Sequence, residues 1–405
     1  MTRRKVVVTA VGVASPVGGS AQSTFDALNA GACGIRRHPD ARIERSVGYV
    51  EQDVAAGLHP GQARMLDRVT LIANYAANQA LEAAALDAGQ QAECGVFIGT
   101  GIGGVSTLCE AVEAYHGVVP KRAVLVVPAV MPQAVAAQIA QGLQSTAEAQ
   151  TYATACSAGA VAIGEAYRRI RDGYLDVAIA GGSESMFSPM LMAAWMQLHV
   201  LCAEPGPGQA GYCRPFSHKR TGFALAEGAA MLVLESAEHA QARNATVIAE
   251  ICGYGVSNDG THPVRPDPRG QALAMSRCLL DGGLTAADVG YINAHATGTL
   301  AGDRIETAAI KQVFGARAGH LPVSSIKGAV GHTIGAAGAI EAVVTAMAVQ
   351  QGVVPPTLFY ASGDPQCDLD YVAEGARQVP DLRVAISNSF GMGGNNAVLA
   401  FRKAA

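Results

Sequence analysis

The chain has 405 residues, of which 50% are hydrophobic and 15% are charged, and its formal net charge is −4. This length and apolar content allow one large core or two fused domains, and the net charge provides no basic footprint for nucleic acid. The nine cysteines contain no C-x-x-C pair, so their spacing indicates neither a disulfide framework nor a zinc site. A reducing cytoplasm fits this composition best.

The N-terminus predicts a buried strand. Thr2 and the charged residues at 3–5 precede an apolar run at 6–17, as in a signal peptide. The apolar residues, however, are β-branched, are interrupted by glycine and run into a turn sequence at Ser15–Gly19. A strand entering a turn is therefore the better interpretation.

Strands and helices alternate along the chain, which predicts a parallel or mixed sheet covered on both faces. The predicted strands are Lys5–Val11, Cys94–Gly99, Leu175–Ala180, Met231–Glu235, Val289–Ala294, Val323–Ser325 and Arg383–Ser387. The predicted helices are Val69–Leu86, Val161–Asp172, Gln271–Asp281, Asp303–Phe314 and Ala336–Gln351. The low-charge stretch at 335–352 contains Glu341 and several glycines, so we expect a buried helix there and no membrane span.

Cys156 lies where a strand-like run, Gln150–Thr154, gives way to a helical run of small residues. A thiol at such a turn meets free backbone N–H groups and the positive end of a helix, which favours the thiolate over the thiol. We therefore predict that Cys156 is a nucleophile. The other eight cysteines are predicted to be small apolar residues.

Two histidine motifs follow at a distance. His295 lies within Asn293–Thr299, and His332 lies within Ser324–His332. Both are surrounded by small residues that let another group approach closely. Only folding could bring these imidazoles to Cys156, and together they would supply the groups that a nucleophilic thiol needs.

A glycine-rich segment, Gly99–Gly104, matches G-x-G-x-x-G after a predicted strand. The acidic residue that a dinucleotide site places about 20 positions further on is missing. Close packing of glycines beneath a pocket is the favoured interpretation.

These motifs, in this order, resemble those of the β-ketoacyl-ACP synthases, the elongating condensing enzymes that include the type II polyketide ketosynthases. The resemblance extends from Val6–Gly12 to Ser387–Asn395 and includes Ala180–Glu184 and Ala301–Asp303. It implies a thiolase-like α/β fold, internally duplicated in five α/β/α/β/α layers. The expected halves are 1–243, which carries the nucleophile, and 244–405, which carries both histidines and a glycine-rich gating loop.

The resemblance also implies the chemistry. Cys156 would take an acyl group from acyl carrier protein, and His295 and His332 would hold the malonyl thioester carbonyl through their N–H groups. Lys327, paired with Glu341, would order this site. The remaining implied residues are Met392 and Phe390 at the oxyanion hole and gate, Thr297 and Thr299 along the pantetheine arm, Ile102 in the acyl pocket, and Phe223 in support.

Two residues depart from the pattern of the family. Met392 stands in the gating loop where related synthases usually have phenylalanine, and Ala296 stands where they usually have glycine. Methionine is more flexible than phenylalanine, so the acyl selectivity is expected to differ more than the activity.

The expected partners are acyl carrier protein and a second subunit, in a homodimer or in a heterodimer with a related ketosynthase-like or chain-length subunit. No metal, free cofactor, nucleic acid or membrane is expected. Because carrier proteins are acidic, Arg64 and Arg68 are candidates for docking, and Lys219 and Arg220 are weaker ones.

Several alternatives stay open at this point. A thiolase is less similar, because its second catalytic cysteine is missing from Gly391–Gly394. A non-catalytic chain-length partner is disfavoured because Cys156, His295 and His332 are all present. The catalytic subunit of a polyketide heterodimer remains possible, and the sequence does not choose between fatty-acid and polyketide synthesis.

Overall fold

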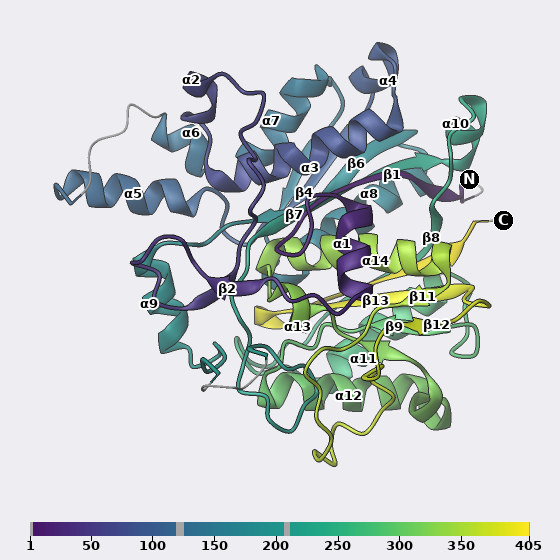
Figure 1. The fold of residues 1–405 in the computed structure, drawn as a ribbon. Coiled ribbons are helices and arrows are strands. Elements are labelled where there is room, and N and C mark those ends of the chain that lie inside the picture. Colours follow the sequence, from purple (N-terminus) through teal and green to yellow (C-terminus); the bar gives the residue numbers. More distant parts are fainter. Residues whose placement is uncertain (1–2, 119–124, 206–210, 405) are drawn as a thin grey trace.

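The computed structural model describes residues 3–118, 125–205 and 211–404 (Figure 1). The first half contains β1 Val6–Ala14, α1 Ala21–Asn29, β2 Ile35–Arg37, β3 Ser46–Gly48, α2 Pro60–Ala63, α3 Arg68–Ala84, α4 Ala88–Ala92, β4 Gly95–Gly99, α5 Val105–Tyr115, α6 Val126–Val130, α7 Ala134–Leu143, β5 Ala149–Tyr152, η1 Ala155–Ser157, α8 Ala158–Arg171, β6 Val177–Glu184, α9 Pro189–Gln197, β7 Gly228–Ser236 and α10 Ala237–Ala242. The second half contains β8 Ala249–Asn258, α11 Pro268–Asp281, β9 Tyr291–Asn293, α12 Leu300–Phe314, η2 Gly315–His320, β10 Val323–Ser324, α13 Lys327–Val330, η3 Ile334–Ala336, α14 Ala337–Gln351, β11 Val353–Val354, β12 Arg377–Gln378, β13 Val384–Gly391, η4 Met392–Gly394 and β14 Asn395–Lys403.

The main sheet repeats one topology twice. Its order is β10-β9-β13-β14-β8-β1-β7-β6-β4-β5. Each half of the chain contributes five strands to this sheet. When the strands of each half are numbered in chain order, both halves follow the order third, second, fourth, fifth, first from the outer edge to the centre of the sheet. The pairings agree as well, because β4 is parallel to β5 and β6 as β9 is to β10 and β13, while β6–β7 and β13–β14 are antiparallel. The two parts join through a short antiparallel ladder between β1 and β8. The expected internal duplication is therefore confirmed.

Helices complete the five layers. α8 and α14 pack between the two parts of the sheet, α3 and α7 cover the outer face of the first part, and α11 and α12 cover the outer face of the second (Figure 1). The segment Ile334–Gln351 is long and apolar enough to cross a membrane, but 89% of it is buried in the protein. It is the core helix that the sequence predicted. The expected boundary at 243/244 falls between α10 and β8 and remains a prediction.

The two central helices meet through glycine. A Cβ atom on Gly159 of α8 would lie 2.9 Å from the backbone N of Ala339 and 2.9 Å from the backbone O of Gly335. Real Cβ atoms do not approach backbone so closely, so α8 and α14 touch backbone to backbone. This contact lies one turn beyond Cys156 and fixes the start of α8.

Candidate active site

Cys156 lies in the 3-10 turn η1 between β5 and α8. The preceding residue, Ala155, has a positive φ of 53°, which is uncommon for a residue with a side chain and marks a sharp change of chain direction. The side chain of Cys156 is buried. The fold therefore places this thiol at the start of a buried helix, as the sequence predicted.

The thiol pKa differs from our expectation. Burial raises the pKa of Cys156 to about 11, although hydrogen bonding from the backbone of Met392 and the charge of Lys327 both act to lower it. The expected preference for the thiolate is therefore wrong. Desolvation opposes the charged form more strongly than the helix end favours it.

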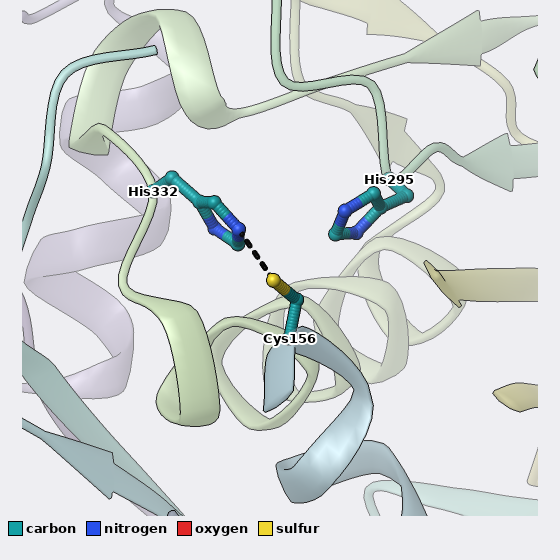
Figure 2. Close-up of side chains that lie close together, drawn as sticks. All are labelled: Cys156, His295 and His332. Carbon is teal, nitrogen blue, oxygen red and sulfur yellow. Dashed lines mark hydrogen bonds between the residues drawn. The ribbon is translucent and has the colours of Figure 1, made fainter. Parts of the chain in front are cut away.

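His332 contacts the thiol directly. Its Nε2 atom lies 3.1 Å from Sγ of Cys156 (Figure 2). The backbone of His332 is held on both sides, since its N–H donates to the carbonyl of Ala224 and its carbonyl accepts from the N–H of Ala226. Gly331, with a φ of 78°, turns the chain into this position after α13. The backbone of His332 is thus fixed beside Leu225.

His295 completes the cluster from the second half of the chain. One metal-ligating atom from each of Cys156, His295 and His332 lies within 4.8 Å of the others. The imidazole rings of His295 and His332 stand edge to face, with centroids 5.4 Å apart. Burial, followed by the charge of Lys327, holds the pKa of each imidazole well below its ordinary value. Both rings are therefore neutral at physiological pH.

Lys327 and Glu341 form a buried ion pair behind the histidines. Their side chains are 1% and 2% exposed, and Nζ of Lys327 donates to the carboxylate of Glu341. Burial raises the pKa of Glu341 to about 7, against the lowering effect of Lys327. The ammonium charge acts on the neighbouring imidazoles from a distance, since Lys327 does not line the cavity.

A cavity of about 200 Å³ opens above the cluster. Its lining includes the three clustered side chains and five further residues that the resemblance implied, namely Phe223, Thr297, Thr299, Phe390 and Met392. The hydroxyl oxygens of Thr297 and Thr299 are 3.1 Å apart, and Phe223 stands edge-on to His332 with ring centroids 5.0 Å apart. The structure thus brings these residues together around one opening.

The glycine-rich loop at Gly391–Gly394 packs against the cysteine turn. A Cβ atom on Gly391 would lie 2.7 Å from the backbone O of Thr154 and 3.3 Å from the backbone N of Cys156. The loop is also tied to the segment after β8, because the N–H of Gly393 donates to the carbonyl of Pro263 at 2.7 Å. Glycine is thus required where the loop carries the Met392 backbone to the thiol.

Three expected residues lie away from this cavity. Ile102 is 44% exposed and is not part of the cavity lining. Arg64 is exposed and Arg68 half-buried, and both line a separate surface hollow. Nε of Arg68 donates at 2.8 Å to the buried carboxylate of Glu227, so its charge is already paired. Arg64 is the better placed of the two for docking, and the roles of all three residues remain predictions.

Two buried carboxylates that were not predicted from the sequence brace the site. Glu306 accepts from the backbone N–H groups of His295 at 2.9 Å and Ala296 at 2.7 Å, and burial raises its pKa to about 7. Glu184 accepts from the N–H groups of Gly101 at 2.6 Å and Gly335 at 3.1 Å. The sequence signal for both is an acidic residue at an apolar position, on a helix face for Glu306 and at a strand end for Glu184. An acidic side chain is buried at such a position only if it is hydrogen-bonded.

Comparisons with known proteins show similarity along the whole chain. The family model described as "Beta-ketoacyl synthase, N-terminal domain" matches residues 3–240, and "Beta-ketoacyl synthase, C-terminal domain" matches residues 248–361. Nodulation protein E of Rhizobium sp. (strain N33) is 40% identical over 99% of both chains. The 3-oxoacyl-[acyl-carrier-protein] synthase 2 of Staphylococcus aureus (strain COL) is 37% identical over 99% of this chain and 98% of its own. A solved structure of a type II PKS acyl-carrier protein in complex with its ketosynthase aligns over the whole of both chains with a TM-score of 0.92 and 28% identity.

Proposed function

This chain belongs to the β-ketoacyl synthase family, and we propose that it lengthens an acyl chain by decarboxylative Claisen condensation with malonyl-acyl carrier protein, using Cys156 as the nucleophile. The observation that supports these roles is the meeting of one thiol and two neutral imidazoles at the base of the cavity. Each half-reaction makes a separate demand on this cluster.

The first half-reaction transfers the acyl group. Sγ of Cys156 attacks the thioester carbonyl of acyl-carrier protein, and a new thioester forms as the bond to the carrier sulfur breaks. Nε2 of His332, 3.1 Å from Sγ, is placed to take the thiol proton and return it to the departing carrier thiolate. The backbone N–H groups of Cys156 and Met392, which already act on the sulfur, are proposed to bind the tetrahedral oxyanion.

The second half-reaction forms the carbon–carbon bond. Malonyl-carrier protein loses carbon dioxide to give an enolate, whose carbon attacks the acyl-Cys156 carbonyl. The sulfur leaves as a thiolate and takes up a proton from solvent. Neutral His295 can donate an N–H to the enolate oxygen, and His332 can do so in the tautomer that carries its proton on Nε2. The buried charge of Lys327 favours the anion from behind. The substrate supplies the carboxylate that drives the step, so the reaction balances without a redox cofactor.

The carrier arm and the partners follow from the same proposal. Thr297 and Thr299 lie in the cavity lining, where they can hydrogen-bond a pantetheine amide. Arg64 is proposed to attract the acidic carrier protein. The chain is proposed to work in the cytoplasm as a homodimer or with a related subunit, and fatty-acid and polyketide elongation both remain open.

Intact-protein mass spectrometry tests the assignment of roles. Acyl-carrier protein should add one acyl group to the wild type and to Cys33→Ser, whose thiol is exposed, but not to Cys156→Ala. His295→Ala should still be acylated while it loses carbon dioxide release from malonyl-carrier protein. An acyl adduct on Cys156→Ala, or equal loss of both half-reactions in His295→Ala, would overturn the assignment.

A further inference from the structure

The cluster at the base of the cavity has the donor set of a metal site as well as that of a nucleophile. Cys156, His295 and His332 offer one thiol sulfur and two imidazole nitrogens, all buried, within 4.8 Å of one another. No carboxylate belongs to the set. Sulfur and imidazole are the ligands that Zn²⁺ prefers over Mg²⁺ or Ca²⁺.

The distances suit a tetrahedral ion. Zn–S bonds near 2.3 Å and Zn–N bonds near 2.0–2.1 Å place ligand atoms about 3.3–3.6 Å apart. Sγ of Cys156 and Nε2 of His332 are already 3.1 Å apart. The widest pair in the cluster would close by about 1 Å to reach tetrahedral spacing, which side-chain rotation can supply. We propose that Cys156, His295 and His332 bind one Zn²⁺ ion, with the fourth position open to the cavity, and that this ion reversibly blocks the thiol.

The thiol must lose its proton to bind zinc, and its raised pKa opposes this step. The two imidazoles need lose no proton when a neutral ring nitrogen faces the ion. Zinc binding replaces the thiol proton, which leaves to solvent, and no electron is transferred. The ammonium of Lys327 opposes a second cation, although it is paired with Glu341.

The surroundings favour an exchangeable ion over a resident one. Among the residues that the structure describes, Nδ1 of His295 and Nδ1 of His332 are buried and have no hydrogen-bond partner. Zinc-binding histidines usually bond their second nitrogen to a carboxylate or carbonyl, and losing that bond weakens metal binding by about 10–100-fold. We therefore expect zinc to act as a reversible inhibitor. The inference depends on the proposed function only in naming acylation as the step that zinc blocks.

Cobalt provides a direct test of the metal site, because Co²⁺ reports both geometry and sulfur ligation in its absorption spectrum. Metal-free protein titrated with Co²⁺ should give intense visible bands of four-coordinate cobalt and a near-ultraviolet thiolate-to-cobalt band, saturating at one ion per chain. Added Zn²⁺ should abolish both. Weak bands typical of six-coordinate cobalt, or saturation above one ion per chain, would overturn the proposal. The wild-type protein is sufficient for this test.

Variants locate the ion. Cys156→Ser should lose the thiolate band, His295→Gln and His332→Gln should each bind Co²⁺ at least 10-fold more weakly, and Cys33→Ser should match the wild type. In a second measurement, Zn²⁺ should slow iodoacetamide alkylation of Cys156 at least 10-fold, and EDTA should restore it. A band that survives Cys156→Ser, or alkylation that zinc leaves unchanged, would disprove the site. Because neither readout requires turnover, this failure is distinct from a failure of the condensing activity.

Discussion

Two opposing effects act on the thiol pKa of Cys156, since the start of the helix favours a low pKa and burial raises it. The local sequence reveals only the first effect. The small-residue run after Thr154 indicates a helix start, and the structure has one there. The depth of the thiol is set by segments far away in the chain, including the Gly391–Gly394 loop and His332. Local sequence therefore predicted the position of the nucleophile but gave the wrong direction for its pKa.

A raised thiol pKa has a measurable consequence. Because the pKa of Cys156 is about 11, its thiolate fraction should rise about tenfold for each pH unit between 7 and 10. The rate of iodoacetamide alkylation at Cys156, followed by peptide mass spectrometry, should rise throughout this range. A small free thiol, measured in parallel, should level off above about pH 8.5. A plateau for Cys156 near pH 7 would show that the thiolate is favoured after all.

Variants of the buried ion pair can separate two contributions of Lys327, one to the stability of the fold and one to the electrostatics of the reaction. Removing one partner leaves a buried charge unpaired, so Lys327→Met should lower the free energy of unfolding by about 3–5 kcal/mol. Lys327→Met combined with Glu341→Gln should recover most of this loss in a denaturant titration. The double variant should nevertheless decarboxylate malonyl-carrier protein more slowly than the wild type, because the charge near the histidines is gone. Recovery of the wild-type rate would mean that Lys327 acts only on stability.

Met392 should affect which acyl groups enter. The substitution Met392→Phe keeps the backbone N–H beside Cys156 but replaces a flexible side chain at the cavity wall with a rigid ring. Acylation rates across a primer series should fall more for wide, rigid or unsaturated chains than for short saturated ones. A uniform fall, or no change, would remove Met392 from the gate.

Helices and strands with a strong hydrophobic periodicity were predictable from the sequence, and strands that depend on close packing were not. Every predicted helix, from the one near Val69 to the one near Ala336, has a counterpart in the structure. The strands β8 and β14 were missed. β8 contains Gly253 and Gly255, which weaken a strand pattern, yet a Cβ atom on Gly255 would lie 2.2 Å from the backbone O of Ala274 in α11. Glycine there permits the helix to lie on the strand, which is a tertiary requirement invisible in the local pattern.

The contact between α8 and α14 predicts a site-directed test. Gly159→Ala places a methyl group against the backbone of α14, so it should lower the free energy of unfolding by roughly 1–3 kcal/mol and reduce acylation of Cys156. Gly142→Ala in α7 is the matched control, because nothing lies within 4 Å of its Cβ position. The control should keep its activity and gain about 0.5–1 kcal/mol from helix propensity. Equal effects of the two substitutions would contradict the close helix contact.

For the whole molecule, the resemblance to a known family predicted the duplicated architecture, because the sequence itself shows no residue-level repeat. The repeat appears in strand order and in the central helices, where backbone geometry is shared and side chains are not. The meeting of Cys156 with His295 and His332 could be predicted only through the resemblance, because no local rule joins residues so far apart in the chain.

The two halves should not be stable alone. One core cluster contains residues from both, such as Ile163 of α8 and Ile340 of α14, so separation exposes a large apolar surface. Fragments 1–243 and 244–405 expressed separately should aggregate, while their co-expression should yield a soluble complex that is acylated at Cys156. Size-exclusion chromatography and mass spectrometry measure both results. A folded, monomeric fragment 1–243 would show an independent domain.

The internal duplication also relates two similar turns that lie beside the nucleophile. Cys156 and Gly335 each occupy the middle of a 3-10 turn whose first residue has a positive φ, Ala155 at 53° and Ile334 at 45°. A Cβ atom at 335 would lie 2.5 Å from the backbone N of Gly101 and 2.7 Å from the carboxylate of Glu184. No single substitution can therefore install a second reactive thiol there. The first of these turns therefore carries the thiol, and the second provides a close backbone contact that leaves no room for a side chain.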